Sequence, residues 1–218
     1  SPTFGMYSFD ASLHGANVVD VPLSEEWEFD EEGLEKAARD AKLVFIPSPN
    51  NPTGNTIPTR LVKKMLETGA VVVIDEAYIE FSKTTSLAAW VEKIPNLVVL
   101  RTFSKWGGLA GLRIGYGVMH PELVNICLQA KQPYNISVIA EAAALAALAD
   151  SATLDARAEI ISAERDRMSA ELAKTEWMTP WPSDASFILF HLDGISGLEL
   201  RDKLRLQGIL LTHDWKTI

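Results

Sequence analysis

Three short apolar runs set the pattern of hydrophobic and polar positions along this chain. They occupy residues 43–46, 70–74 and 97–100, and none of them contains a polar side chain. Uninterrupted runs of this length are typical of strands in a parallel sheet that is covered on both faces. Residues 59–69, between the first two runs, have the apolar spacing of a helix and end in a glycine. The pattern therefore predicts an α/β fold with a mostly parallel sheet.

The remaining segments extend this pattern to both ends of the chain. We expect further strands at residues 18–21, 114–119, 187–190 and 209–211. We expect further helices in the stretch that ends near residue 16 and at residues 34–41, 88–93, 121–131, 137–150 and 198–206. One long amphipathic helix is predicted over residues 154–174, with Leu154, Ile161 and Met168 repeating every seven positions as its buried stripe.

A change in composition after the long helix predicts a domain boundary. Two tryptophans and two prolines fall within residues 177–182, which predicts a rigid linker. We expect a large α/β domain over residues 1–152, a long helix over 153–178, and the start of a small α/β domain over 179–218.

Composition and charge exclude several classes of protein. The 218 residues, 47% of them hydrophobic, suffice for one sizeable core. The net charge of −9 argues against nucleic acid or an anionic membrane surface as a partner, and no apolar run approaches the ~20 residues of a membrane span. The single Cys127 cannot form an internal disulfide, suits a reducing compartment, and is expected to pack in the core. The spacing of His14, His120, His191 and His213 is not that of metal ligands, so no metal site is expected.

A lysine follows the third apolar run. Lys105 and its neighbour Ser104 open a glycine-containing loop, and Arg113 lies eight positions after Lys105. Open α/β sheets bind their ligands at this place, just past the end of a buried strand. Partial desolvation and a nearby cation make such an amine easier to deprotonate, as Schiff-base chemistry requires, and a guanidinium suits phosphate. Lys105 is therefore a candidate nucleophile, with an ordinary surface lysine as the alternative.

The other two runs also end in polar residues. Asp75, Glu76 and Tyr78 follow the second run, and the sequence PSPNNPTG, which contains Asn51, follows the first. Because parallel strands end at the same edge of a sheet, these groups are expected to meet Lys105 there. The sequence thus predicts a cofactor site at this edge.

Simpler interpretations of the same residues remain open at this point. Asp75 suits a helix N-cap, and Asn51 suits a turn among prolines and glycine. The stretch VVVIDEAY is also similar to the acidic strand of nucleotide hydrolases. Such an enzyme requires a G-x-x-x-x-G-K-[ST] loop, and these 218 residues contain none.

Four motifs together resemble one family. PTFGMY, SPNNPTG, VVVIDEAYIEF and LRTFSKWGGLAGLRIGYG are similar to the fold-type-I aminotransferases that use pyridoxal 5′-phosphate. The sequences of the last two motifs are most similar to those of the histidinol-phosphate branch of that family. The resemblance extends over residues 2–211, and the order Asn51, Asp75, Lys105 makes it specific.

The resemblance implies a role for each motif residue. Lys105 would hold the cofactor and move a proton, Asp75 would pair with the pyridine nitrogen, and Asn51 and Tyr78 would bind the ring's phenolate oxygen. Phe4, in PTFGMY, would stack on the cofactor ring. The phosphate would be bound by Thr102, Ser104 and Arg113. Tyr134 is a weaker candidate on the substrate side, with a structural role as the alternative.

The implied reaction is transamination between L-histidinol phosphate and 2-oxoglutarate, which gives L-glutamate. Another aminotransferase of aromatic or aspartate substrates, a threonine-phosphate decarboxylase, or an inactive piece of one would have the same motifs. Some transcription factors carry a similar domain, but the acidic balance and the lack of a basic recognition helix argue against that class.

The resemblance further implies that the large domain over 1–152 has three layers, α/β/α, and that the helix over 153–178 is an interdomain helix. It also implies a larger context for this chain. Because it starts in mid-motif, we expect an internal piece of a longer protein that forms a homodimer, in the cytoplasm or in a plastid stroma. We expect the isolated 218 residues to lack transaminase activity, and the strands ending at Asp75 and Lys105 to be left beside uncovered edges.

Overall fold

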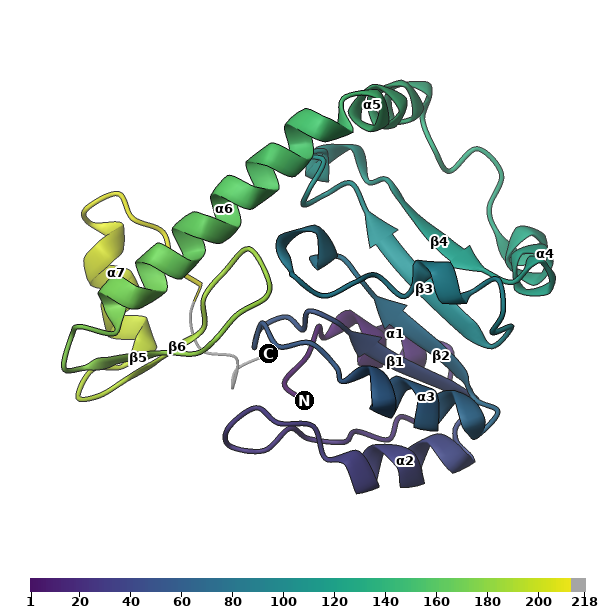
Figure 1. Cartoon of the computed structure of the whole chain (residues 1–218), viewed down its shortest axis with the longest axis horizontal. Coiled ribbons are helices and arrows are strands. Elements are labelled where there is room, and N and C mark those ends of the chain that lie inside the picture. Colours follow the sequence, from purple (N-terminus) through teal and green to yellow (C-terminus); the bar gives the residue numbers. More distant parts are fainter. Residues whose placement is uncertain (213–218) are drawn as a thin grey trace.

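The computed structural model describes residues 1–212, which contain a four-stranded sheet in the order β1-β2-β3-β4 (Figure 1). Its strands are β1 (Leu43–Pro47), β2 (Val71–Asp75), β3 (Leu97–Thr102) and β4 (Gly115–Met119). The first three strands are parallel, and β4 runs antiparallel to β3. All three apolar runs are therefore strands, and the prediction of a mostly parallel sheet is confirmed.

Seven α-helices accompany the strands within residues 1–212. They are α1 (Met6–Leu13), α2 (Glu31–Asp40), α3 (Thr59–Glu67), α4 (Pro121–Ala130), α5 (Val138–Ala149), α6 (Ser151–Leu172) and α7 (Gly197–Arg205). Three short 3₁₀ helices lie at Ile79–Phe81, Ala88–Trp90 and Ala110–Leu112. The side chains of Asp30 and Ser137 accept hydrogen bonds from the first turns of α2 and α5, which explains where these helices begin.

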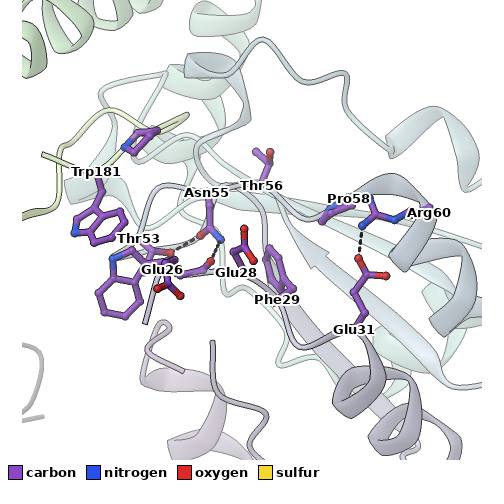
Figure 2. Close-up of a pocket in the computed structure, with 12 residues that line it drawn as sticks. Glu26, Glu28, Phe29, Glu31, Thr53, Asn55, Thr56, Pro58, Arg60 and Trp181 are labelled. Carbon is purple, nitrogen blue, oxygen red and sulfur yellow. Dashed lines mark hydrogen bonds and ion pairs between the residues drawn. The ribbon is translucent and has the colours of Figure 1, made fainter. Parts of the chain in front are cut away.

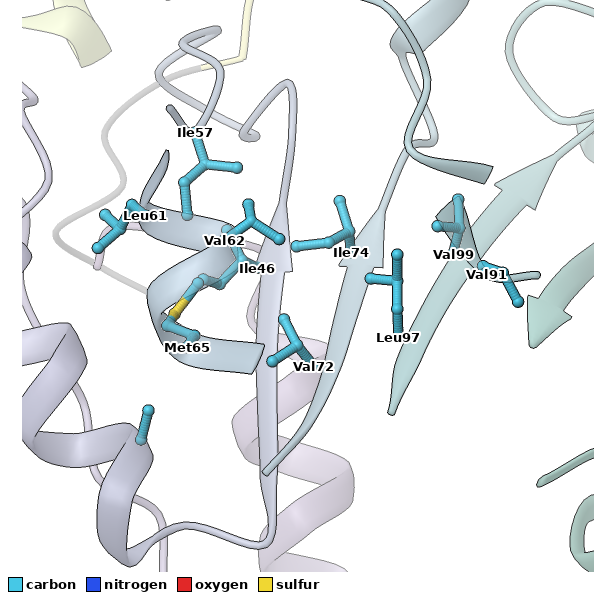
Figure 3. Close-up of a cluster of buried hydrophobic side chains, with 11 residues drawn as sticks. Ile46, Ile57, Leu61, Val62, Met65, Val72, Ile74, Val91, Leu97 and Val99 are labelled. Carbon is cyan, nitrogen blue, oxygen red and sulfur yellow. The ribbon is translucent and has the colours of Figure 1, made fainter. Parts of the chain in front are cut away.

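The main core lies between α3 and one face of the sheet (Figure 3). Leu61, Val62 and Met65 on α3 are fully buried against alternate positions of the strands. The strand residues of this cluster are Ile46, Val72, Ile74, Leu97 and Val99. Each such side chain stabilises the fold by about 1.5–3 kcal/mol, so this layer fixes the strands whose ends carry the candidate site.

The opposite face of β1 is covered less completely. Leu43 and Phe45 are 55% and 43% exposed, although both belong to an uninterrupted apolar run. The ring of Tyr7, on α1, stacks on Phe45 with the ring centroids 5.5 Å apart. A run without polar residues therefore did not imply equal burial on both faces of this strand.

The small lobe, which follows α6, contains a strand within the predicted linker. Strands β5 (Met178–Pro180) and β6 (Phe190–Leu192) pair antiparallel, and α6 runs from beside the sheet to this lobe, where α7 also lies (Figure 1). The prediction of a linker over residues 177–182 is wrong, since β5 lies within it. The prediction of a strand over 187–190 is shifted, because only Phe190 of that range pairs with β5.

Two other strand predictions are wrong. Residues 18–21 form no strand, and the nearest bridge joins Leu23 to Phe29. Residues 209–211 likewise form no strand within the described chain. The strands ending at Asp75 and near Lys105 are flanked on both sides, so the edges of the described sheet are β1 and β4 instead.

Three details of burial also differ from the sequence pattern. Cys127 is exposed, with its Sγ 3.8 Å from the Sδ of Met119, so it does not pack in the core. On α6, Leu154 is buried but Ile161 and Met168 are exposed. A straight helix drifts by about 20° per seven residues, so a seven-residue repeat leaves the buried face. The buried positions of α6 are Leu154, Ala158 and Arg165.

No helix in the described range, 1–212, is both long and apolar enough to cross a membrane. Over the same range, no three His, Cys, Asp or Glu side chains come together as a metal site would require, and His213 lies outside it.

Candidate active site

The carboxyl ends of β1, β2 and β3 lie side by side. Pro47 is in register with Asp75, and Asp75 with Leu100. Backbone bonds extend this register beyond the strands, from Ser48 N to Asp75 O at 2.8 Å and from Glu76 N to Leu100 O at 2.9 Å. The segments that carry Asn51, Asp75 and Lys105 therefore leave the sheet at one edge. This arrangement was predicted from the sequence.

Asp75 is held by groups from two parts of the chain. Its Oδ2 accepts a hydrogen bond of 2.7 Å from the Tyr7 hydroxyl, and its Oδ1 accepts one of 3.0 Å from Ala77 N. Burial raises the pKa of Tyr7 well above its usual range, and the neighbouring Asp75 carboxylate raises it further. Tyr7 therefore stays neutral and remains a donor to Asp75.

Sequence reasoning missed Tyr7, although it lies in the PTFGMY motif. The signal was its place in the same motif as Phe4, three residues later and within the first turn of α1. Phe4 is exposed, and its ring meets the ring of Tyr7 edge-on, with centroids 5.6 Å apart. Phe4, Tyr7 and Phe45 thus form a row of aromatic rings beside Asp75.

Lys105 and Tyr78 are in contact. The Lys105 Nζ lies over the Tyr78 ring, 5.3 Å from its centroid, in the geometry of a cation–π interaction. The same tyrosine ring contacts Phe187 of the small lobe edge-on, with centroids 5.1 Å apart. Lys105 itself is exposed rather than partly desolvated, so Tyr78 contacts an exposed candidate nucleophile on one side and a residue more than a hundred positions away on the other.

In the PSPNNPTG loop, Asn50 has the structural role that was considered for Asn51. Asn50 is buried, and its Nδ2 donates to Pro2 O at 3.0 Å and to the Thr53 Oγ1 at 2.7 Å. Its Oδ1 accepts from the Thr3 hydroxyl at 2.9 Å. The half-buried Asn51 makes no side-chain hydrogen bond within residues 1–212. Its amide is therefore free to bind a ligand.

The candidate phosphate ligands are held by local contacts. Ser104 N donates to the Thr102 hydroxyl at 3.0 Å. Arg113 is exposed, has a left-handed backbone conformation with φ 51°, and donates from Nη1 to Ala110 O at 2.8 Å. No hydrogen bond or ion pair within the described residues joins Arg113 to Lys105. Tyr134 is almost fully exposed and makes no contact with these groups.

A buried charge network supports the strand ends from behind. Glu76, only 1% exposed, accepts hydrogen bonds from the Ser86 hydroxyl at 2.6 Å and from Leu87 N at 2.7 Å. Arg101 bridges Glu76 and Glu80 at 3.3 and 2.6 Å. Burial alone would lower the pKa of Arg101, but these carboxylates, Glu80 foremost, raise it above its usual value. The network therefore joins the loop after β2 to the end of β3.

One cavity of the described structure lies apart from these groups. It has a volume of about 370 Å³ and is lined by Trp27 together with Thr53, Asn55 and Trp181, which Figure 2 labels. The Trp27 and Trp181 rings meet edge-on, with centroids 6.1 Å apart, and Asn55 Nδ2 donates to Trp27 O at 2.7 Å. Neither Asp75 nor Lys105 lines this cavity. We therefore place the candidate active site at the carboxyl ends of β1, β2 and β3, where Asp75, Tyr78 and Lys105 converge.

Comparison with known proteins identifies relatives over almost the whole chain. The family model described as aminotransferase class I and II matches residues 1–215. Histidinol-phosphate aminotransferase from Roseiflexus castenholzii is 46% identical over 97% of this chain and 58% of its own length. The chloroplastic histidinol-phosphate aminotransferase of Nicotiana plumbaginifolia is 41% identical over 97% of this chain and 52% of its own length. The chain thus spans little more than half of these curated relatives.

Solved structures give the same picture of the fold. The histidinol-phosphate aminotransferase of Clostridium acetobutylicum superposes with a TM-score of 0.89 at 30% identity, over 96% of this chain and 65% of its own. The Sinorhizobium meliloti enzyme, solved in complex with pyridoxal-5′-phosphate, gives a TM-score of 0.85 at 30% identity, over 96% of this chain and 59% of its own. The L-threonine-O-3-phosphate decarboxylase of Porphyromonas gingivalis, at 22% identity and a TM-score of 0.84 over 99% of this chain and 66% of its own, shares the fold.

Proposed function

The chain belongs to the class I and II aminotransferase family, and from this premise we propose that its complete protein transfers an amino group between L-histidinol phosphate and 2-oxoglutarate. The cofactor would be pyridoxal 5′-phosphate. The observation that carries the proposal is the convergence of Asp75, Tyr78 and Lys105 at one edge of the sheet. The similarity to histidinol-phosphate aminotransferases supports this substrate over others.

The residues present fit the chemical groups of this cofactor. Its pyridine nitrogen calls for a carboxylate, its aldehyde for an amine and its phosphate for a cation, and Asp75, Lys105 and Arg113 supply these in turn. When bound, pyridoxal phosphate supplies the electron sink that stabilises a carbanion at the substrate Cα. The protein has to position the cofactor and tune it.

Asp75 would hold a proton on the pyridine nitrogen. Its carboxylate is oriented by Ala77 N and by the Tyr7 hydroxyl, so it meets the ring without reorganising. Because Tyr7 stays neutral, this orientation persists across the ordinary range of pH.

Lys105 would bind the cofactor covalently, and its freed amine would then move the proton at the substrate Cα. The ring of Tyr78 beneath its Nζ limits where that amine can go. Asn51 and Tyr78 would donate hydrogen bonds to the phenolate oxygen. Phe4 would cover one face of the ring.

Thr102, Ser104 and Arg113 would bind the cofactor phosphate. The guanidinium now bonds to Ala110 O, and a bidentate phosphate contact would replace that local hydrogen bond. The residues proposed to bind the phosphate are thus held by contacts within their own loop, whereas Asp75 is held by the distant Tyr7.

We also propose the division into a large domain over 1–152, a helix over 153–178 and a small domain over 179–218. The course of α6 between the sheet and the β5–β6 pair supports it, and residues 213–218 lie outside the described range (Figure 1). A homodimer is proposed for the complete protein. Limited proteolysis that cuts near residues 150–153 or 173–178 before any other site would support these boundaries.

One assay tests the proposed substrate. The complete protein is supplied with 2-oxoglutarate and, in turn, with histidinol phosphate, aspartate, phenylalanine or threonine phosphate, and glutamate and carbon dioxide are measured. We expect glutamate with histidinol phosphate at the highest kcat/KM. A higher value with aspartate or phenylalanine, or carbon dioxide from threonine phosphate, would contradict the proposal.

A further inference from the structure

A buried cation lies in the middle of α6. Arg165 is only 8% exposed, although the helix around it carries exposed charges such as Glu164 and Arg167, which pair with each other at 2.9 Å. The only carboxylate that Arg165 contacts within the described chain is its neighbour Asp166, which is itself exposed. Burying a guanidinium is costly unless its donors are used. The position of its other partners therefore indicates what it does.

Those partners are carbonyl oxygens from two distant segments. Nη1 of Arg165 donates to Phe81 O at 3.2 Å and to Ala185 O at 2.8 Å. Phe81 closes the motif that begins at Asp75, whereas Ala185 is a fully buried residue of the small lobe. Arg165 thus ties a segment next to the candidate site to a segment that lies 104 positions further on (185 − 81).

The segment around Ala185 reaches the candidate site at two points. Asp184 N donates to Gly54 O, in the loop that carries Asn51, at 2.7 Å. A side chain at Gly54 would collide with Ser183, so the two backbones are as close as glycine allows. Two residues after Ala185, Phe187 contacts the ring of Tyr78 edge-on. We call residues 183–187 the lobe turn.

We propose that Arg165 is a positioning residue, which holds the lobe turn so that Phe187 keeps Tyr78 in place against Lys105. This inference rests on the proposed function, because it gives Tyr78 a task in that reaction. Arg165 itself touches neither Tyr78 nor Lys105 and acts only through the lobe turn. A residue in the middle of α6 thus helps to position the candidate site.

The hydrogen bonds predict which segment would be destabilised by the loss of Arg165. Phe81 O also accepts a hydrogen bond of 3.0 Å from the Ser162 hydroxyl, so it keeps a partner without Arg165. Ala185 O has no second donor within residues 1–212 and would be left buried and unpaired. The disturbance should therefore appear in the lobe turn and spare the segment that ends at Phe81.

Hydrogen exchange measured on the complete protein tests this step without any catalysis. In R165M we expect amides in peptides covering residues 178–192 to exchange about tenfold faster, with residues 71–81 unchanged. R167M, two positions along the helix, is the matched control and should behave as wild type. Unchanged exchange over 178–192, or an equal increase over 71–81, would overturn the proposal. If R165M does not fold, R165L, which also carries no donor for Ala185 O, takes its place, and a wild-type rate there overturns the proposal equally.

A second experiment tests the link to the site. If Arg165 acts through Phe187, the effects of R165M and F187L on kcat should not add: about tenfold for each alone, and little more for the double variant. Both single variants should also shift the pH at which the bound cofactor's visible absorption changes, whereas R167M should not. Additive losses near a hundredfold, or a wild-type titration in R165M, would overturn the proposal. A wild-type protein without transaminase activity would instead overturn the proposed function, and the exchange experiment would still stand.

Discussion

Asp75 and Arg113 lie near the same edge of the sheet but are held in opposite ways. Asp75 is oriented by Tyr7, a residue 68 positions earlier, and by Ala77 in its own loop. Within residues 1–212, the Arg113 side chain bonds only to Ala110, three positions before it, and it is exposed. A group fixed by distant partners is preorganised by the fold, whereas a group fixed by its own turn can change partner at little cost. We therefore expect substitutions on the Asp75 side to lower turnover, and substitutions on the Arg113 side to weaken cofactor binding.

The largest effect should come from Lys105, on which both sides depend. K105A in the complete protein should abolish measurable turnover, because no other described amine lies against Tyr78. Borohydride reduction of the wild-type holoenzyme, followed by peptide mapping, should place the pyridoxyl group on Lys105. K131A serves as the control and should keep activity. Label on Lys63, Lys64 or Lys131 would contradict the site assignment, because the cofactor would then bind away from Asp75 and Arg113.

D75N should lower kcat by about 10³-fold, because an amide cannot hold the ring nitrogen protonated by charge. Its thermal unfolding should remain close to that of the wild type, since Asp75 lies at a strand end outside the main core. D10N, on the exposed part of α1, is the matched control. A kcat near that of the wild type would show that Asp75 merely ends a strand.

Y7F should lower kcat by about tenfold through the loss of one hydrogen bond to a charged group. The aromatic contacts with Phe4 and Phe45 remain, so the fold should be unaffected. Y116F removes a hydroxyl from a half-exposed ring on β4 and serves as control. If Y7F raised only the KM of the cofactor, Tyr7 would belong with Arg113 rather than with Asp75.

R113K should leave kcat within about twofold and raise the dissociation constant of the cofactor about tenfold, because lysine loses the bidentate geometry. Equilibrium dialysis of the cofactor measures this, with R157K on the exposed face of α6 as control. A loss of kcat at saturating cofactor would show that Arg113 is as preorganised as Asp75.

The smallest effect concerns stability at high pH. The pKa of Tyr7 is raised in the folded state, so above pH ~10 the unfolded chain loses a proton that the folded chain keeps. Tyr7 therefore contributes a loss of stability of at most about 1.4 kcal/mol per pH unit in that range. In Y7F this part of the decline should vanish, as measured by denaturant unfolding at pH 9 and 11. Equal slopes in both proteins would contradict the burial of Tyr7 beside a charged Asp75.

The sequence predicted the parts that depend on local patterns. The uninterrupted apolar runs identified β1 to β3, and the position of polar residues at their ends predicted which edge carries the site. It did not predict Tyr7 as the partner of Asp75, because two residues 68 positions apart come together only after the sheet has formed. Arg165 was missed for the same reason: on a helix rich in charge, nothing local distinguishes a buried arginine from exposed ones.

The errors have equally physical causes. Residues 18–21 have the composition of a strand, but no strand of the described sheet pairs with them. The tryptophans and prolines at 177–182 suggested a stiff connection, yet β5 pairs there because Pro180 lies at the end of a two-stranded edge. Pairing across a sheet is decided by distant segments, and a single segment does not reveal it.

The reversal of direction between β3 and β4 has a consequence for the length of the loop between them. Thr102 pairs with Gly115, and Phe103 N bonds to Ile114 O, so residues 103–114 form a loop closed at its base. Lys105 and Arg113 both lie on this closed loop, near its two ends. Closing a loop costs entropy that changes little with one added residue, so the fold should tolerate insertions at its tip, near Gly108. The distance between the Lys105 amine and the Arg113 guanidinium would then depend on the paired base of the loop. Insertions near Gly108 would change the tip of the loop and leave these two charged groups in place.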